Sequence, residues 1–369
     1  VLVRGSILKS DYFKGSRNKN IRQLLNGTIN FRAVDEYPVG GCGIPTGEGI
    51  VNILSFFFGK PCTTTCEPGL APPFTVEALL WLNLREEPLI YVNSKPFVLR
   101  DYDQPYINLE NTGITSRRLE AMEKQLKFDT TQESALGDGL LLHDEDDDGN
   151  MVAYSEPIHE NSIQTPYELF TSCISELTKL NGGTKFFAEY FRAPITDEQA
   201  PSAISFDMLI KHLESSNRDK KRCIMFNCQM GRGRTTTGCL CSICFRHDHC
   251  LFVESASRSQ VIQSLVRNLV NGEALKKQVD YIIDLCGDMQ NLREVIDNIS
   301  FTHLGCVRDP AVRPNVSSTQ KRFFHRPRQK DISYLVRYFY LIVFNAYMTQ
   351  EVKTNFKNPL VHWLTERPG

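Results

Sequence analysis

The sequence has no excess of charge of either sign and no hydrophobic run long enough to cross a bilayer. It contains 42 Lys and Arg residues against 43 Asp and Glu residues, a net charge of −1. Without a net basic field the chain has no general attraction for nucleic acid or for an anionic membrane. The longest apolar segment, residues 334–348, contains Arg337 and Asn345 and is too short for a transmembrane helix.

Targeting signals and low-complexity segments are also missing. Residues 1–5 do not have the pattern of a secretory signal, and no clear internal repeat is present. The twelve cysteines are therefore interpreted as thiols of a reducing compartment, and we expect the chain in the cytoplasm. A chain of 369 residues with 41% apolar residues can bury a sizeable core without disulfides.

Pairs of metal ligands at familiar spacing are scarce. Cys62 and Cys66 have no second pair nearby, so ordinary thiols are expected. Residues 144–149 match the start of a calcium loop, but Ser155 stands where a bidentate Glu is needed, which favours a solvated hairpin turn. A later cluster of soft ligands begins with two cysteines on different sides of a helix, so we expect no metal and no other cofactor. The members of that cluster are Cys239, Cys241, Cys244, His247, His249 and Cys250.

One stretch, residues 223–238, is typical of a phosphate-binding loop. Its first residues, 223–227, form an apolar run that predicts a buried strand. Gly231 and Gly233 allow a tight turn, and a helical pattern begins near Arg234. The N–H groups of such a loop and the positive end of the following helix bind an anion. Arg234 would close the cradle with two hydrogen bonds to phosphate oxygens.

The residues around this loop suggest phosphate chemistry. Cys228 lies at the floor of the predicted cradle, where the surrounding fields favour a thiolate that can attack phosphorus. Asp197, in a loop after a predicted strand, is the candidate donor of a proton to the leaving oxygen, and Glu198 and Asp207 are rival carboxylates. Thr235 is the candidate donor of a hydrogen bond to the sulfur, with a simple helix-start hydroxyl as the alternative.

The remaining loop residues and two arginines are the candidate substrate ligands. Arg232 adds a second positive charge at the rim, which suits a substrate with several phosphates, such as an inositol phosphate or a phosphoinositide. Arg192 and Arg85 each follow a predicted strand and would extend the basic patch, with a structural ion pair as the alternative for each. The predicted substrate-binding residues are Gln229, Met230, Gly231, Arg232, Gly233, Arg192 and Arg85.

The order of strand, helix, strand, loop and helix predicts an α/β fold with a mostly parallel central sheet flanked by helices. Residues 78–84 and 186–191 are predicted strands, and residues 89–100 are predicted as an additional N-terminal hairpin. Residues 166–180 are a predicted helix, and Ser205 is the predicted cap of another. The active loop is expected at the carboxyl end of a strand.

The domain organisation follows from the same pattern. We expect residues 1–305 to form one phosphatase-like domain that contains the loop 228–234. Residues 306–369 are expected to form a loop, to about residue 329, and then a C-terminal helix over residues 333–349 that packs on the domain.

Several segments also resemble known proteins. Residues 227–238, with the pattern Cys-x5-Arg-Thr, resemble the signature of the protein tyrosine phosphatase (PTP) superfamily and, more specifically, of the paladin family. Residues 85–88, 95–101 and 194–198 resemble the same family, so the resemblance covers most of residues 1–250. Paladins are long proteins with repeated phosphatase-like units, so the chain resembles one unit and the resemblance implies other units as partners.

The chain is more distantly similar to the PTP-like cysteine phytases, which remove phosphates from inositol phosphates. This kinship implies the tyrosine-phosphatase fold, with Cys228 as nucleophile, Arg234 as phosphate clamp and Asp197 as acid. The sequence departs from the pattern at Asn227, where His is usual, and at Glu198, where the phytases typically have His. Both departures predict a slower or narrower enzyme. A carboxylate at 198 repels a highly phosphorylated substrate, and the missing His at 227 removes one support for the thiolate.

We therefore interpret the chain as a cysteine-dependent phosphatase acting on phosphoinositides or inositol phosphates. Asn227 favours an alternative, a pseudophosphatase that binds phosphorylated partners as a scaffold, because the missing His removes one support for the thiolate. A protein tyrosine or dual-specificity phosphatase is the third hypothesis.

Overall fold

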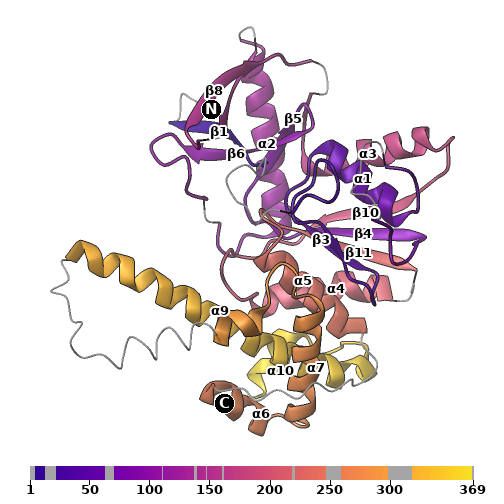
Figure 1. Cartoon of the computed structure of the whole chain (residues 1–369), viewed down its shortest axis with the longest axis vertical. Coiled ribbons are helices and arrows are strands. Elements are labelled where there is room, and N and C mark those ends of the chain that lie inside the picture. The colour runs from indigo at the N-terminus through magenta and orange to yellow at the C-terminus, as the bar shows by residue number, and fades with distance from the viewer. Residues whose placement is uncertain are drawn as a thin grey trace. The chain divides into compact units, whose positions relative to one another are not determined.

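The described part of the chain falls into two compact units in the computed structural model (Figure 1). The first unit contains Val1–Asp197 and Ser216–Thr235, and the second contains Glu198–Ser215 and Thr236–Gly369. The predicted boundary near residue 305 falls outside the described residues and stays a prediction. The described residues are 5–12, 22–62, 70–109, 111–136, 139–146, 148–159, 162–217, 221–246, 259–297 and 318–367.

The first unit contains a five-stranded, mostly parallel sheet with the strand order β10-β4-β11-β3-β2. Four of its strands run parallel to their neighbours, and the short β2 is antiparallel to β3. The strands predicted at residues 78–84, 186–191 and 223–227 are confirmed, as is the mostly parallel sheet. The strands are β10 (Phe187–Arg192), β4 (Ala78–Asn83), β11 (Arg222–Asn227), β3 (Val39–Cys42) and β2 (Arg32–Ala33).

Helices α1 (Gly47–Phe57) and α3 (Pro166–Leu180) cover one face of this sheet (Figure 1). Their apolar sides pack against Trp81 of β4 and Met225 of β11 in one buried cluster. Thr46 caps α1 by accepting a hydrogen bond from the Gly49 N–H at 3.2 Å, and Thr165 and Glu168 form a capping box at α3. The bounds predicted for α3 are confirmed.

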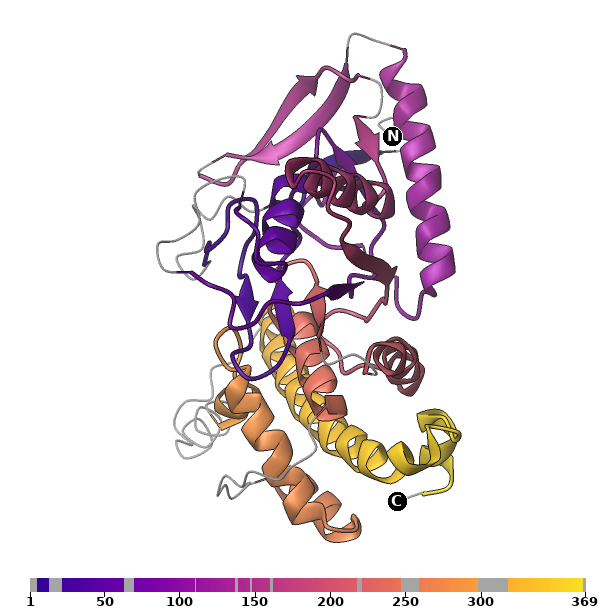
Figure 2. The same ribbon diagram turned by 90° about the vertical axis from the view of Figure 1, so that its right-hand side faces the viewer.

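A second sheet of the first unit has six strands in the order β8-β7-β1-β6-β5-β9. The predicted hairpin forms its β5–β6 pair, with Asn93 and Ser94 in left-handed conformations at φ 48° and 64°, as a two-residue turn requires. Leu126 of α2 (Ser116–Ser134) packs against this sheet, and Figure 2 shows the helix beside its strands. The strands are β8 (Met151–Glu156), β7 (Leu140–Glu145), β1 (Ser6–Ser10), β6 (Lys95–Asp101), β5 (Leu89–Val92) and β9 (Ile163–Gln164).

Residues 144–149, the segment that matches the start of a calcium loop, begin at the end of β7 and lead into the turn to β8, so the predicted hairpin turn is confirmed. Asp146 organises the turn locally, because its Oδ1 accepts a hydrogen bond from the Asn150 N–H at 2.7 Å. No group of three or more metal-ligating side chains occurs in the ranges that the structure describes. Cys66, His247, His249 and Cys250 of the candidate ligand pairs lie outside those ranges.

The second unit holds α6, α7, α9 and α10 together with most of α4 and α5. Phe206 of α4 stacks on Phe344 of α9 with ring centroids 4.9 Å apart. No helix among the described residues has the length and apolarity that a membrane crossing demands. The helices are α4 (Ala203–Asn217), α5 (Gly233–Arg246), α6 (Gln260–Asn268), α7 (Gly272–Leu285), α9 (Ser318–Glu351) and α10 (Leu360–Thr365), and a 3₁₀ turn, η2, spans Val352–Thr354.

Two predictions about these helices are wrong. Ser205 lies inside α4, and the cap is Ser202, whose hydroxyl accepts the Ser205 N–H at 3.1 Å. Either serine satisfies the sequence rule for a cap, and only the position of the first turn distinguishes them. Helix α9 begins at Ser318, so the loop predicted to residue 329 is wrong from residue 318 onward, and residues 306–317 lie outside the described residues. The segment is rich in Pro, Arg and His, but its Lys, Arg and Gln residues favour a helix.

Candidate active site

The site lies where the parallel strands of the five-stranded sheet end together. In the register of the sheet, Asn227 at the end of β11 pairs with Cys42 of β3 and Asn83 of β4, and Asn83 pairs with Arg192 of β10. The segments that leave these strands therefore start at one edge of the sheet. This brings together residues 84–87, 193–197 and 228–234, which are far apart in sequence. Cys228, the predicted nucleophile, is 3% exposed and immediately follows β11.

The carbonyl groups of the loop 228–234 anchor its backbone by accepting hydrogen bonds from residues outside the loop. Three successive carbonyls, those of residues 229–231, each accept a hydrogen bond from the segment 30–44. In a planar trans peptide the carbonyl and the next N–H point in opposite directions, so the N–H groups of residues 230–232 face away from these partners. A row of N–H groups on one side of a loop is what an anion needs. The bonds are Ile44 N to Gln229 O (2.9 Å), Asn30 Nδ2 to Met230 O (2.8 Å) and Arg32 Nη1 to Gly231 O (2.7 Å).

Gly231 is required at the turn of this loop. Its φ is +72°, which side chains rarely adopt, and a Cβ there would lie 2.3 Å from Gly43 N and 2.4 Å from the carbonyl carbon of Cys42. The loop therefore sits directly against the end of β3. The prediction that glycine permits the tight turn is confirmed at Gly231.

The structure brings Arg234 and Asp197 together. Arg234 is 5% exposed, and its Nε lies 3.1 Å from Asp197 Oδ1. Its Nη1 also donates a 3.4 Å hydrogen bond to the Ile195 carbonyl, so the guanidinium contacts two residues of the segment after β10. The Asp197 side chain is 40% exposed, whereas Arg234 is enclosed. The candidate clamp and the candidate acid are thus neighbours.

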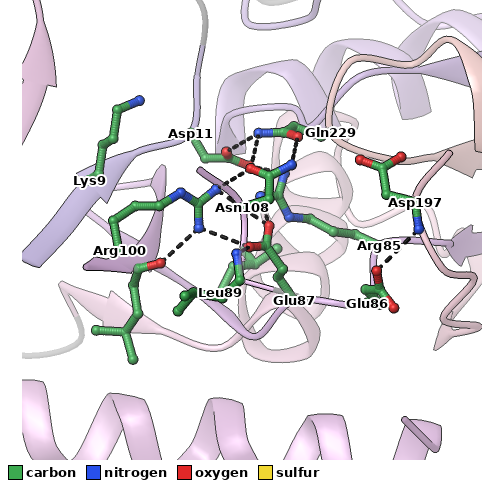
Figure 3. Close-up of polar contacts among 12 residues, drawn as sticks. Lys9, Asp11, Arg85, Glu86, Glu87, Leu89, Arg100, Asn108, Asp197 and Gln229 are labelled. Carbon is green, nitrogen blue, oxygen red and sulfur yellow. Dashed lines mark hydrogen bonds and ion pairs between the residues drawn. The ribbon is translucent and has the colours of Figure 1, made fainter. Parts of the chain in front are cut away.

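Glu86 is a further acidic residue at this site that sequence reasoning missed. It is 3% exposed, and its Oε1 accepts a hydrogen bond from the Asp197 N–H at 3.1 Å (Figure 3). Burial raises the pKa of the Glu86 carboxyl, and the nearby charge of Arg234 opposes that shift. Its sequence signals were its place two residues after a predicted strand, between two charged residues, and within the segment 85–88 that resembles the paladin family.

Arg85, a predicted substrate ligand, is fully buried in a cluster of ion pairs (Figure 3). Its guanidinium forms ion pairs with both Asp11 and Glu87. Arg100 pairs with the same Glu87 at 2.9 Å, so two guanidinium groups and two carboxylates neutralise one another. This arrangement is the structural ion pair that the sequence left as an alternative, and a role of Arg85 toward substrate stays a prediction.

The same cluster reaches the phosphate loop through the side chain of Gln229 (Figure 3). Gln229 Nε2 donates to Asp11 Oδ1 at 3.1 Å, and Asn108 Nδ2 donates to Gln229 Oε1 at 2.8 Å. Arg100 donates in turn to Asn108 Oδ1 at 2.7 Å. Gln229, the residue after Cys228, is therefore held by side chains from the segments that follow β1 and β6.

Arg192, the other predicted strand-end ligand, is 1% exposed and faces Glu123 of α2, with Nη2 and Oε1 3.3 Å apart. It also donates to the Glu87 carbonyl at 2.8 Å. Burial raises the pKa of Glu123 to about 7, against the opposing charge of Arg192. A binding role for Arg192 stays a prediction, since these groups surround its charge.

The raised pKa of Glu123 predicts a pH-dependent stability. Folded Glu123 keeps its proton to about pH 7, whereas the unfolded residue loses it near 4.5, so stability falls as the pH rises between these values. Between about pH 5 and about pH 8 we expect the wild type to lose about 2 kcal/mol of unfolding free energy relative to Glu123→Gln. Urea unfolding at both pH values measures this difference. The exposed Glu176 of α3 provides the control Glu176→Gln, and equal pH dependence of wild type and Glu123→Gln would contradict the prediction.

Thr235 and Asn227 flank the loop and are both buried. The Thr235 hydroxyl donates its one proton to the Cys42 carbonyl at 3.3 Å, so the hydrogen bond to the Cys228 sulfur stays a prediction. Asn227 Oδ1 accepts a hydrogen bond from Trp81 Nε1 at 2.8 Å. The residue that replaces the usual His therefore anchors the indole of Trp81. Arg232 is half-buried on the loop.

The two rival acids differ from Asp197 in their surroundings. Glu198 is exposed and has a left-handed backbone with φ 55°. Asp207 belongs to the second unit, where its carboxylate caps α10 by accepting the Leu360 N–H at 2.6 Å and the Val361 N–H at 3.2 Å. Of the three carboxylates, Asp197 is the one with an ion pair to Arg234.

Comparison with known proteins shows first which family and which solved structures the chain resembles. Residues 82–244 match the family model of the PTP-like phytases, described by the term inositol hexakisphosphate. The structure resembles the PTP-like myo-inositol phosphatase of Mitsuokella multacida, solved with myo-inositol-(1,3,4,5)-tetrakisphosphate, with a TM-score of 0.55 and 14% identity over 98% of this chain and 48% of that chain. The tandemly repeated PTP-like phytase of the same organism has the same TM-score at 15% identity, covering 98% of this chain and 48% of that chain. The predicted PTP-like α/β fold is confirmed.

Among curated proteins the matches are paladins. The chain is 24% identical to paladin of Gallus gallus over 91% of its length, and 26% identical to that of Xenopus tropicalis over 91%. It is 23% identical to paladin of Homo sapiens over 99% of its length. It covers 36%, 36% and 38% of these relatives, so it spans little more than a third of their length. The chain is therefore similar in sequence to the paladins and, over residues 82–244, to the PTP-like phytases.

Proposed function

We propose that this chain is a cysteine-dependent phosphatase unit that hydrolyses phosphomonoesters through a phosphocysteine intermediate. The observation that carries the proposal is the loop after β11, which combines outward-held carbonyls with a buried Arg234 beside Asp197. Such a loop supplies N–H groups and one guanidinium to a bound phosphate, directly next to Cys228.

The residues have complementary roles in two steps. The Cys228 thiolate attacks phosphorus while the bond to the leaving oxygen breaks, and Asp197 donates a proton to that oxygen. Water then attacks the phosphocysteine, Asp197 takes up the proton, and orthophosphate and the thiolate are released. Arg234 and the loop N–H groups hold the phosphoryl oxygens in both steps. Arg232, beside the cradle, adds positive charge for a second phosphate group.

Phosphoinositides and inositol phosphates are the proposed substrate class. The structural relative solved with an inositol tetrakisphosphate and the phytase family model both support a polyphosphorylated ring. Glu198, exposed next to the acid, disfavours the most highly phosphorylated rings by repulsion, so we propose substrates with few phosphates. Phosphotyrosine is the third candidate, because the same cradle accepts one phosphate.

A panel of substrates tests this function. Orthophosphate release by the wild type is measured on phosphoinositide vesicles, soluble inositol phosphates and phosphotyrosine peptides. Turnover on the inositol compounds supports the proposal. Failure to release phosphate from any compound would sink it, and binding of the same ligands without turnover, measured by calorimetry, would support the scaffold alternative that Asn227 favours.

A further inference from the structure

The carboxylate of Glu86 accepts a hydrogen bond from the segment that carries the candidate acid. We call residues 194–197 the acid loop. Glu86 Oε1 accepts the Asp197 N–H at 3.1 Å, and the neighbouring Thr196 side chain also favours the charged form of this carboxyl group and so lowers its pKa. Glu86 Oε2 is buried and has no hydrogen-bond partner among the described residues. The hydrogen bond of this carboxylate therefore ends on the acid loop.

Burying the carboxyl group of Glu86 costs free energy, which suggests that its position has a functional reason. A carboxyl group that is 3% exposed has lost most of its hydration, and burial is the main cause that raises its pKa. Glu87, the next residue, is also buried, but it is satisfied by Arg85, Arg100 and the Leu109 N–H at 2.6 Å. Successive residues after β4 thus serve different parts of the site, and Glu86 serves the acid loop.

The second hold on the acid loop comes from Arg234. Its Nε lies 3.1 Å from Asp197 Oδ1, and its Nη1 donates to the Ile195 carbonyl at 3.4 Å. A phosphate in the cradle needs that guanidinium for its own oxygens, so the contacts of Arg234 with the acid loop weaken when substrate binds. The hydrogen bond from the Asp197 N–H to Glu86 involves no group that the phosphate uses, so it can persist when substrate binds.

We propose that Glu86 is a positioning residue that holds the acid loop over the phosphate loop while Arg234 binds the substrate phosphate. This inference rests on the phosphatase function proposed for the chain. The backbone before the loop is already fixed, because Ala193 N donates to Asn83 O at 2.8 Å and Ile195 N donates to Leu84 O at 3.0 Å. Glu86 extends that fixation to the residue that donates the proton.

Leaving-group dependence distinguishes this role from general support of the fold. Phenolate, which leaves from phenyl phosphate, is a poor leaving group and needs a proton. The leaving group of para-nitrophenyl phosphate is a good one and hardly needs a proton. Glu86→Ala is expected to lower kcat/KM, which reports the first step and not the hydrolysis of the phosphocysteine, by about 10- to 100-fold on phenyl phosphate and by less than about 3-fold on para-nitrophenyl phosphate. Glu86→Gln keeps an oxygen that can accept the Asp197 N–H, so both rates are expected to remain within about 3-fold of wild type.

Hydrogen–deuterium exchange gives a readout that needs no activity. In Glu86→Ala, exchange of the peptide containing the acid loop is expected to be about 10-fold faster, and Glu86→Gln should restore it. The exposed Glu176 of α3 provides the control Glu176→Gln, which should change neither measurement. Equal losses on both substrates with unchanged exchange overturn the inference and leave the phosphatase function standing. Absence of wild-type turnover instead removes the phosphatase function, and exchange still decides whether Glu86 holds the loop.

Discussion

Replacing Cys228 with serine is expected to lower phosphate release by more than about 10⁴-fold while leaving substrate binding nearly unchanged. A serine hydroxyl in the same place is not ionised at neutral pH, so the nucleophile is lost. The loop carbonyl bonds and Arg234, which shape the cradle, do not involve the sulfur. Phosphate release measures the first effect, and calorimetric titration with the best substrate of the panel measures the second.

The other cysteines make this prediction specific. Burial raises the pKa of Cys173 and of Cys244 to about 12, so these thiols remain protonated at neutral pH and cannot replace the nucleophile. Cys62 is half-buried outside the site and provides the control Cys62→Ser, for which turnover should match the wild type. Turnover that survives in Cys228→Ser would exclude a phosphocysteine intermediate.

Replacing Arg85 with methionine is expected to reduce the free energy of unfolding by about 3–5 kcal/mol, because it leaves buried charges without their partner. Asp11 and Glu87 would share Arg100 alone, and burial already raises the pKa of Asp11 despite the charge of Arg85. Methionine keeps the length of the aliphatic part of the arginine side chain, so the packing of that part is largely retained. Urea unfolding monitored by tryptophan fluorescence measures the loss.

A surface ion pair supplies the matched control for Arg85. Lys221 pairs with Glu77, and both side chains are about two-thirds exposed, at 65% and 66%. Lys221→Met should therefore cost less than about 1 kcal/mol. Adding Asp11→Asn to Arg85→Met should recover part of the stability, since one uncompensated charge is removed. Equal stability of Arg85→Met and the wild type would show that the buried cluster contributes nothing to the fold.

Local patterns in the sequence were enough to predict several elements. The helical pattern of residues 166–180 predicted α3, and the turn at Asn93 and Ser94 predicted the β5–β6 hairpin. In each case the information lies within a few residues, because caps, turns and apolar periodicity are local properties. The helix that begins at Gly233 and the strand that ends at Asn227 were visible for the same reason.

The sequence did not predict which strands pair or which distant residues hold the loop 228–234. The six-stranded sheet pairs β1 with β6 and β7, and a single sequence does not show which distant strands become neighbours. Asn30 and Arg32 bind the carbonyls of a loop about 200 residues later, with |i−j| of 200 and 199. Nothing in their own neighbourhood indicates that contact.

The sequence by itself determined the loop 228–234 and the kind of fold that holds it, because Cys228, the glycines and Arg234 lie within one short segment whose spacing is a covalent fact. The tertiary structure alone decided which charges surround that loop. It enclosed Arg85 and Arg192 among carboxylates and brought Glu86 to the backbone of Asp197. Charges act through distance in space, and only the packing of the strands sets that distance.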